Sequence, residues 1–315
     1  MLHLTREEIL TYLQTAYTQD HYTGFNGCRL RYIVSKKQSS SAVVVLGGRT
    51  EFIEKYGEFL YDLEDLDCSF YSYDHRGQGL SDRFLEDGRK GYVADFQEYV
   101  EDLKIFLEEI VAPHKHDKTV IISHSMGGTI AVRFEQQYPG ILDGLILSSP
   151  MFSIETAPVP RLIAAFVISC LVRLGFGTRY IFGRKHYEAS EMYEGNKVTS
   201  SRERFLLNRE FVETTPDLVL GGPTNSWVWE AFKATAETLA GAGQGTIPIL
   251  LLQSGADQVV AAAAQQQFCE KRTNCQMHTV PGALHELLME EDCYRDKALS
   301  LIRSFIKNLG NELSF

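Results

Sequence analysis

The stretch that decides the fold is KTVIISHSMGGTIAVRFEQQY, residues 118–138. Its opening, KTVIIS, has the short apolar run of a buried strand. Its end, TIAVRFEQQY, continues at helical spacing until Pro139-Gly140, a pair that stops helices. Small residues lie between the two parts. The stretch therefore predicts a strand, a tight turn at Ser125 and a helix from about Met126 to Tyr138.

The same alternation of strand and helix continues on both sides of this stretch. Further strands are expected at 28–34, 41–46, 68–73, 142–147, 247–253 and 276–280, and helices at 52–66, 95–110, 261–271 and 294–309. Short buried strands that alternate with helices form mostly parallel sheets covered on both faces. We therefore predict an α/β fold with a mostly parallel central sheet flanked by helices.

The alternation breaks between residues 151 and 245, here called the inserted segment. This part of the chain is helical, aromatic and irregular, and it contains Pro158, Pro160, Pro216 and Pro223. An insertion between two strands of a parallel sheet is best interpreted as a cap over the carboxyl ends of the strands, where active sites of such sheets lie. The predicted division is a core of residues 1–150 and 246–315 and a mainly helical cap of residues 151–245.

Ser125 is the candidate nucleophile. The turn around it matches the G-x-S-x-G nucleophile elbow of the α/β-hydrolase fold, in which the serine occupies a strained turn with small neighbours. Ser123 stands where the first glycine is expected, but serine is also small. The alternative is an ordinary glycine-rich helix start, and the correct strand and helix on either side favour the elbow.

The acid and the base are expected after later strands, because α/β-hydrolases place them in the chain order Ser, Asp or Glu, His. Asp257 follows strand 247–253 and His285 follows strand 276–280. We predict that His285 is the general base and that Asp257 orients it; the alternatives are a helix-capping Asp257 and a surface His285. Other histidines fit less well, and His124, beside the serine, is expected to point elsewhere.

Two backbone N–H groups should stabilise the oxyanion that forms on the acyl carbon. One belongs to Met126, the residue after the nucleophile. The other should come from the loop after strand 41–46, where Gly47-Gly48 allows close approach and Arg49 N–H is the favoured donor. Two roles are considered for the Arg49 side chain: contact with a lipid head group, or an ion pair with an acidic residue.

Composition excludes several classes of protein. The net charge of −10 argues against a nucleic-acid binder. The six cysteines show no CxxC or CxxH spacing, so they indicate neither a zinc site nor a dense disulfide framework, and reduced thiols in a cytoplasm are the default expectation. The pattern of the N-terminus predicts an amphipathic helix and not a signal peptide.

One apolar run, residues 162–172, is too short to span a bilayer. Five basic residues and no acidic ones lie between Thr156 and Tyr187: Arg161, Arg173, Arg179, Arg184 and Lys185. The alternatives are a buried cap helix beside a solvated basic face, or a wall of an acyl groove that touches an anionic membrane surface.

The chain resembles the PldB-type bacterial lysophospholipases, relatives of the monoacylglycerol lipases, from about Phe25 to Leu309. The resemblance rests on GGRTEFIEKYGEFLYDL, YDHRGQGLS, SHSMGG, SSPMF, GGPTNSWVWEA, LLLQSGADQVV and PGALHELLME. The loop Gly48-Arg49-x-Glu51 and the segment Gly221-Gly222-Pro223-Thr224 with Trp227 are the most family-specific. One departure is the alanine run 261–264, where relatives often carry a further acidic residue.

The resemblance implies hydrolysis of the acyl ester of a lysophospholipid at the cytoplasmic face of a membrane, with no metal or cofactor. Its motifs place Ser125, Asp257 and His285 on the triad and Arg49 and Met126 on the oxyanion positions. The triad itself leaves three alternatives open: a monoacylglycerol lipase or broad carboxylesterase, an acyltransferase, and, from a different class, a non-catalytic binding module on the same fold.

Overall fold

The computed structural model describes residues 4–156, 158–183 and 193–309. Its centre is an eight-stranded sheet in the order β1-β2-β4-β3-β5-β6-β7-β8. The strands are β1 Tyr17–Thr23, β2 Arg29–Ser35, β3 Ser41–Leu46, β4 Ser69–Tyr73, β5 Lys118–His124, β6 Gly144–Ser148, β7 Ile249–Ser254 and β8 Cys275–Val280. From β4 to β8 all pairs are parallel, while β2 is antiparallel to β1 and β4.

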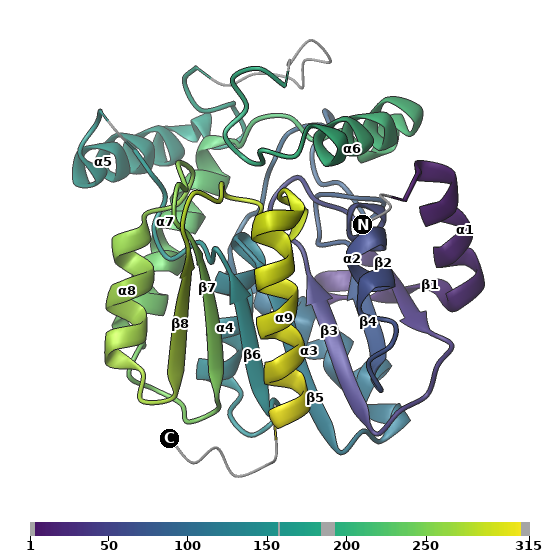
Figure 1. Ribbon diagram of the computed structural model, residues 1–315. Helices are drawn as coiled ribbons and strands as arrows, with labels where there is room; N and C mark the ends of the chain where they lie inside the picture. The colour runs from purple at the N-terminus through teal and green to yellow at the C-terminus, as the bar shows by residue number, and fades with distance from the viewer. Residues whose placement is uncertain (1–3, 157, 184–192, 310–315) are drawn as a thin grey trace.

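Helices cover both faces of the sheet, as Figure 1 shows. They are α1 Arg6–Ala16, α2 Gly57–Asp62, α3 Gln97–Phe106, α4 Met126–Gln137, α5 Arg161–Leu171, α6 Arg202–Thr214, α7 Asn225–Ala240, α8 Ala262–Lys271 and α9 Asp292–Asn308. The buried residues of α3, α4, α7 and α8 share one apolar cluster, and those of α1, α2 and α9 share the other. This three-layered arrangement is that of an α/β-hydrolase.

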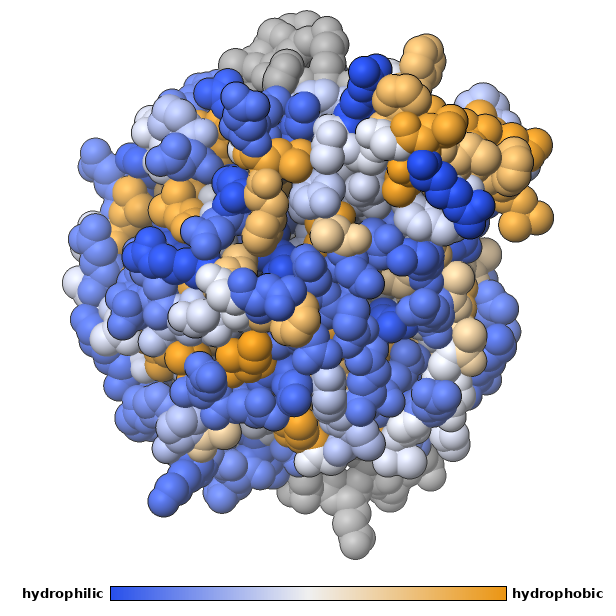
Figure 2. All heavy atoms as spheres, turned by 180° about the vertical axis from the view of Figure 1, so that it is seen from behind, coloured by the Kyte–Doolittle hydropathy of each residue, from blue (hydrophilic) through white to orange (hydrophobic). Residues whose placement is uncertain are grey.

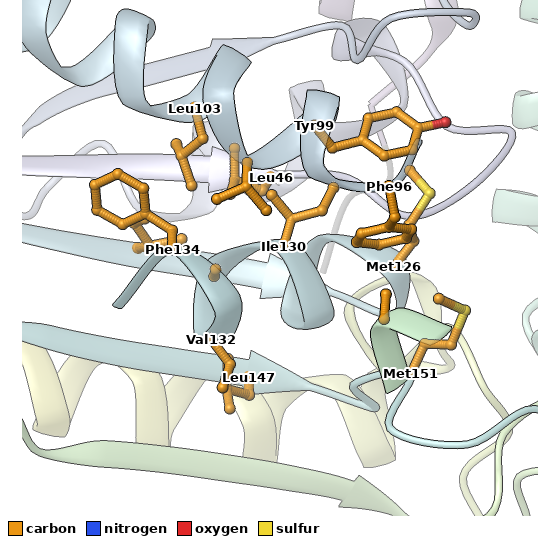
Figure 3. Close-up of a cluster of buried hydrophobic side chains, with 14 of the residues drawn as sticks. Leu46, Phe96, Tyr99, Leu103, Met126, Ile130, Val132, Phe134, Leu147 and Met151 are labelled. Atoms are coloured by element: carbon orange, nitrogen blue, oxygen red, sulfur yellow. The ribbon is translucent and has the colours of Figure 1, made fainter. Parts of the chain in front are cut away.

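The strands supply both clusters because successive side chains of a strand point to opposite faces. In β3, Val43 and Val45 belong to the cluster under α2 and α9, whereas Val44 and Leu46 belong to the cluster under α3 and α4. Figure 3 shows Leu46 packed with Ile130 of α4 and Leu103 of α3. The continuous apolar runs of the sequence are therefore strands buried on both faces.

Two details differ from the sequence prediction. Helix 52–66 is shorter than expected: a 3₁₀ turn at Ile53–Tyr56 (η2) leads into α2, which ends at Asp62. Strand β1 was not predicted, because its sequence YTQDHYT is polar and its burial pattern belongs to an edge strand with one exposed face.

The inserted segment contains α5, α6 and α7. In Figure 1, α5 and α6 lie above the upper ends of the strands. Helix α7 packs against α4 and contributes Trp227 and Phe232 to the core cluster. Loops of the inserted segment contact those after β3 and β8: Arg49 donates to Gly221 O, and Glu286 N lies 2.7 Å from Val198 O. The division into core and cap stays a prediction.

The expectation of reduced thiols is wrong for one pair. Cys269 of α8 and Cys275 of β8 form a disulfide with a Cα–Cα distance of 5.3 Å, and the other four cysteines are free. The pairing depends on α8 turning back into β8, which spacing in sequence does not reveal. Within the described parts of the chain, no helix has the length and apolar character needed to cross a membrane.

Candidate active site

Ser125 lies in a strained turn between β5 and α4. Its φ of 49° and ψ of −113° are rare for a residue with a side chain. The turn is held by hydrogen bonds from Ser125 N to Ser148 O at 3.0 Å and from Met151 N to Ser125 O at 2.9 Å. Ser123 fits in place of glycine, since its hydroxyl donates to Ile146 O at 3.3 Å. The elbow therefore forms despite the departure from G-x-S-x-G.

Glycines after the serine allow the close packing that the elbow needs. A Cβ at Gly127 would lie 2.7 Å from Gly47 O, and one at Gly128 would lie 2.7 Å from Pro150 Cβ. The side chain of Met126 points into the apolar cluster beside Phe96, Tyr99 and Met151, as Figure 3 shows. Its backbone N–H is thereby fixed at the first turn of α4, where no helical carbonyl accepts it.

The structure brings Ser125, His285 and Asp257 into one hydrogen-bonded chain. His285 Nε2 is 3.0 Å from Ser125 Oγ, and His285 Nδ1 is 2.7 Å from Asp257 Oδ2. These residues lie 160 and 28 positions apart in sequence and meet because the loops after β5, β7 and β8 share the carboxyl edge of the sheet. The geometry is that of a nucleophile, a base and an orienting acid.

Asp257 is held as a carboxylate. Its Oδ1 accepts hydrogen bonds from Val259 N at 2.8 Å and Val260 N at 3.1 Å. Burial raises the pKa of Asp257, but the hydrogen bond and charge of His285 and the two N–H groups outweigh it, and the pKa lies below the ordinary value. An ionised acid at this place fixes the imidazole tautomer that leaves Nε2 facing the serine.

The loop 47–51, here called the oxyanion loop, packs directly against the serine. A Cβ at Gly48 would lie 3.1 Å from Ser125 Cβ. Thr50 has a φ of 68°, a left-handed conformation that a β-branched residue rarely adopts. Gln78 Nε2 holds the loop by donating to Gly48 O at 2.7 Å and to Glu51 O at 3.0 Å.

Buried charges that sequence reasoning missed lie behind this loop. Glu51 accepts from Gly48 N and, at 2.5 Å, from Tyr56 OH, and its Oε1 is 2.8 Å from Lys55 Nζ. Lys55 Nζ is also 2.7 Å from Glu286 Oε1. The only sequence signal was the Glu51–Lys55 spacing of four residues.

His124 does not point away from the site, contrary to expectation. Its ring centroid is 4.8 Å from that of His285, its Nδ1 is 3.2 Å from Ser148 O, and its Nε2 is 3.9 Å from Glu51 Oε1. Burial lowers the pKa of His124. A neutral ring here packs against His285 without adding a second cation beside it.

The Arg49 side chain extends from the oxyanion loop to the inserted segment. Its Nη2 donates to Gly221 O, and its guanidinium carbon lies 5.3 Å from the centroid of a Trp227 ring. This contact was not predicted from the sequence, where a lipid head group or an acidic residue was considered as the partner of the Arg49 side chain. Among the described residues, no group of three or more His, Cys, Asp or Glu side chains could hold a metal.

Known proteins resemble this chain over most of its length. The family described as "Serine aminopeptidase, S33" matches residues 37–292. Lysophospholipase L2 of Escherichia coli strain K12 is 36% identical over 293 residues, which cover 90% of this chain and 86% of the relative. The probable lysophospholipase L2 of Haemophilus influenzae is 28% identical and covers 95% of both chains.

A solved structure with the same fold is a soluble variant of monoglyceride lipase from Saccharomyces cerevisiae in complex with a substrate analog. It superposes with a TM-score of 0.73 at 16% identity and covers 93% of this chain and 96% of that one. The fold is thus that of the α/β-hydrolases. The chain belongs to the family described as serine aminopeptidase S33 and is a relative of lysophospholipase L2.

Proposed function

We propose that this protein hydrolyses the acyl ester of lysophospholipids through an acyl-enzyme on Ser125. The observation that carries the chemistry is the hydrogen-bonded chain Ser125–His285–Asp257 at a strained elbow. The substrate class is supported by the relative called lysophospholipase, which is 36% identical over most of both chains.

The first half-reaction forms the acyl-enzyme. His285 Nε2 accepts the proton of the Ser125 hydroxyl while Oγ attacks the ester carbonyl, and the carbonyl oxygen becomes an oxyanion. The backbone N–H groups of Arg49 and Met126 are the proposed donors to that oxyanion. The tetrahedral intermediate collapses, the ester C–O bond breaks, and His285 gives its proton to the leaving alcohol of the glycerophospho group.

The second half-reaction returns the free enzyme. Water attacks the acyl carbon and His285 takes one proton from it; the bond between Ser125 Oγ and the acyl carbon then breaks, His285 gives its proton to Oγ, and the fatty acid leaves. Asp257 stabilises the imidazolium in both steps. If an alcohol replaces water at this stage, the outcome is acyl transfer.

A substrate panel tests this assignment. We expect the purified protein to cleave long-chain lysophosphatidylcholine and lysophosphatidylethanolamine with higher kcat/KM than monoacylglycerol of the same chain length or short p-nitrophenyl esters. Preference for monoacylglycerol would indicate a monoacylglycerol lipase, and preference for short esters would indicate a broad carboxylesterase. No hydrolysis of any ester, with Ser125 unreactive toward a fluorophosphonate, would favour the non-catalytic binding module.

We further propose that α5 rests on an anionic membrane surface. The outward face of α5 carries apolar side chains at successive turns, with exposed fractions of 84% for Leu162, 69% for Phe166 and 48% for Val167. Ile168 and Ser169, in the last turn of α5, are buried. Figure 2 shows an apolar group at the upper right, and α5 occupies this corner when Figure 1 is viewed from behind.

Basic residues next to this face favour anionic lipid as its partner. Arg173 and Arg179 are exposed beyond the end of α5, close to the exposed Leu174. Arg184 and Lys185, which belong to the same basic stretch of sequence, lie outside the described residues. An apolar helix face flanked by arginines is typical of interfacial helices.

The cytoplasmic location stays a prediction. The Cys269–Cys275 disulfide argues against it, because disulfides rarely persist in a reducing cytosol. Cell fractionation, with thiol labelling of the two cysteines before and after reduction, would decide between the cytoplasmic and an oxidising side of the membrane.

A further inference from the structure

The two most family-specific motifs of the sequence, the oxyanion loop and the segment 221–227, meet through one side chain. Arg49 donates to Gly221 O, 172 positions away in sequence, and its guanidinium lies over the ring of Trp227. Trp227 is buried, with 5% exposed, and belongs to the same apolar cluster as Tyr99 of α3. One end of Arg49 therefore reaches the core, and its backbone lies beside the nucleophile.

The place that receives the guanidinium is built by backbone pairing. Gly91 N donates to Gly222 O at 3.1 Å, Thr224 N donates to Gly91 O at 2.8 Å, and Gly221 N donates to Arg89 O at 2.7 Å. Gly91 itself leaves room for Arg49, because a Cβ there would lie 2.6 Å from Arg49 Nη2. The inserted segment is thus fastened to the core at the point where the arginine binds it.

The oxyanion loop needs such support. Two glycines at its start and the left-handed Thr50 make it costly to hold in one conformation. Glu51 and Gln78 hold it from the core side. The planar Arg49 fork, which can hydrogen bond and stack at once, holds it from the side of the inserted segment.

We propose that Arg49 is a positioning residue whose side chain clamps the oxyanion loop to Gly221 and Trp227. The position of the inserted segment then determines where the backbone N–H of Arg49 points. This inference rests on the proposed function, because it assigns a means of control to the same site. It also gives a physical reason why a displaced inserted segment would lower turnover without any change at Ser125, His285 or Asp257.

Three variants probe the clamp. Arg49→Met removes the guanidinium but keeps an apolar stem, and Arg49→Lys keeps the charge without the planar fork. Gly91→Ala pushes the guanidinium out of its place and leaves Arg49 itself unchanged. Arg161→Met is the matched control, because Arg161 likewise donates to Thr235 Oγ1 at 2.8 Å and lies 5.7 Å from the Phe232 ring, without touching the oxyanion loop.

The readout is hydrolysis of a short, water-soluble p-nitrophenyl ester, together with inhibition by an alkyl boronic acid, whose tetrahedral adduct on Ser125 occupies the oxyanion site. Loss of one oxyanion donor lowers kcat by about 10²- to 10³-fold. We expect the displaced donor of Arg49→Met to lower kcat about 10- to 100-fold with KM nearly constant, and Arg49→Lys and Gly91→Ala to lower kcat by smaller factors.

Boronic acid inhibition separates positioning from general damage. The inhibition constant should rise in proportion to the fall in kcat across the three variants, while inhibition by the fatty acid product stays constant. Wild-type kcat and boronic acid affinity in Arg49→Met and Gly91→Ala, with Ser125→Ala inactive, would overturn the clamp and leave the proposed function intact. An equal loss in Arg161→Met would also overturn it. If Arg49→Met does not fold, Gly91→Ala decides the question by itself.

Discussion

The Lys55 ammonium lies 2.7 Å from Glu286 Oε1, which joins the residue after His285 to the oxyanion loop through a buried cation. The same ammonium is 2.8 Å from Glu51 Oε1, and the Lys55 side chain is 4% exposed. Burial alone would lower the pKa of Lys55, but Glu286 and Glu51 raise it above the ordinary value. Lys55 is therefore charged, and it holds two loops of the site at a fixed separation.

Lys55→Met should lower both the stability of the protein and its rate of ester hydrolysis. Removing one partner of a buried ion pair leaves an uncompensated charge and costs about 3–5 kcal/mol. We expect a loss of this size in the free energy of unfolding by urea, and a fall in kcat because Glu51 no longer holds Gly48. Lys104→Met, which breaks a partly exposed pair with Glu108, is the control and should cost less than about 1 kcal/mol. Equal costs would show that the Lys55 network is not structural.

Ser125→Ala should abolish ester hydrolysis while the fold remains. Loss of the nucleophile of a triad typically costs about 10⁴-fold or more in turnover. A fluorophosphonate probe should label the wild type at Ser125 and fail to label the variant, with unchanged circular dichroism. Persistent labelling of the alanine variant would refute the assignment of the nucleophile.

Asp257→Asn should reduce kcat by about 10⁴-fold, because an asparagine leaves His285 in the wrong tautomer. The sequence offered no second acid in this loop, and the structure ties His285 Nδ1 to Asp257. Asp95→Asn, an exposed acid ahead of α3, serves as the control and should keep wild-type activity. A loss of less than about tenfold in Asp257→Asn would mean that another carboxylate orients the histidine.

Sequence reasoning predicted the alternation of strands and helices, and it predicted the loops of Ser125, Asp257 and His285 because each residue follows an expected strand and a turn. The strands ahead of Ser125 and Asp257 are apolar, whereas β8, ahead of His285, is CQMHTV and only partly apolar. It missed β1, whose polar sequence carries no buried run, and the disulfide, which depends on how α8 returns to β8. The ion network behind the oxyanion loop was also missed. Lys55 meets Glu286 only because the loops after β3 and β8 converge, and nothing in local spacing encodes that approach.

Acid should weaken the fold through His75. This ring is buried, its Nε2 lies 3.0 Å from Gly47 O, and burial lowers the pKa of His75 to about 4 from its ordinary 6.5. Below pH 6.5, His75 therefore binds a proton in the unfolded chain but stays neutral in the folded protein. The free energy of unfolding falls as the pH is lowered toward 4. The full difference corresponds to about 3 kcal/mol.

The measurement compares wild type with His75→Gln, whose amide can still donate to Gly47 O. Urea unfolding at pH 7.5 and pH 4.5 should show that the wild type loses about 2 kcal/mol more than the variant. The comparison cancels other titrating groups, including the buried Asp74, whose pKa is raised to about 6 and whose effect has the opposite sign. Equal losses in both proteins would show that His75 is protonated without cost.

Binding to anionic vesicles should depend on both the apolar face of α5 and its basic neighbours. Each arginine near an anionic surface contributes about 1 kcal/mol, reduced by screening at physiological salt. The net charge of −10 works against this attraction, so attachment should be reversible and salt-sensitive. Co-sedimentation with vesicles that contain anionic lipid, at low and high salt, measures it.

Two variants separate the contributions. Changing Arg173, Arg179, Arg184 and Lys185 to Gln should remove most of the salt-sensitive binding, while Phe166→Asp should weaken binding at every salt concentration. Ile141→Asp is the matched control, because Ile141 is an exposed apolar residue outside α5, just ahead of the amino end of β6. Wild-type binding by the glutamine variant would defeat the electrostatic contribution. Wild-type hydrolysis of long-chain substrate by Phe166→Asp would defeat the prediction that α5 also forms a wall of the acyl groove.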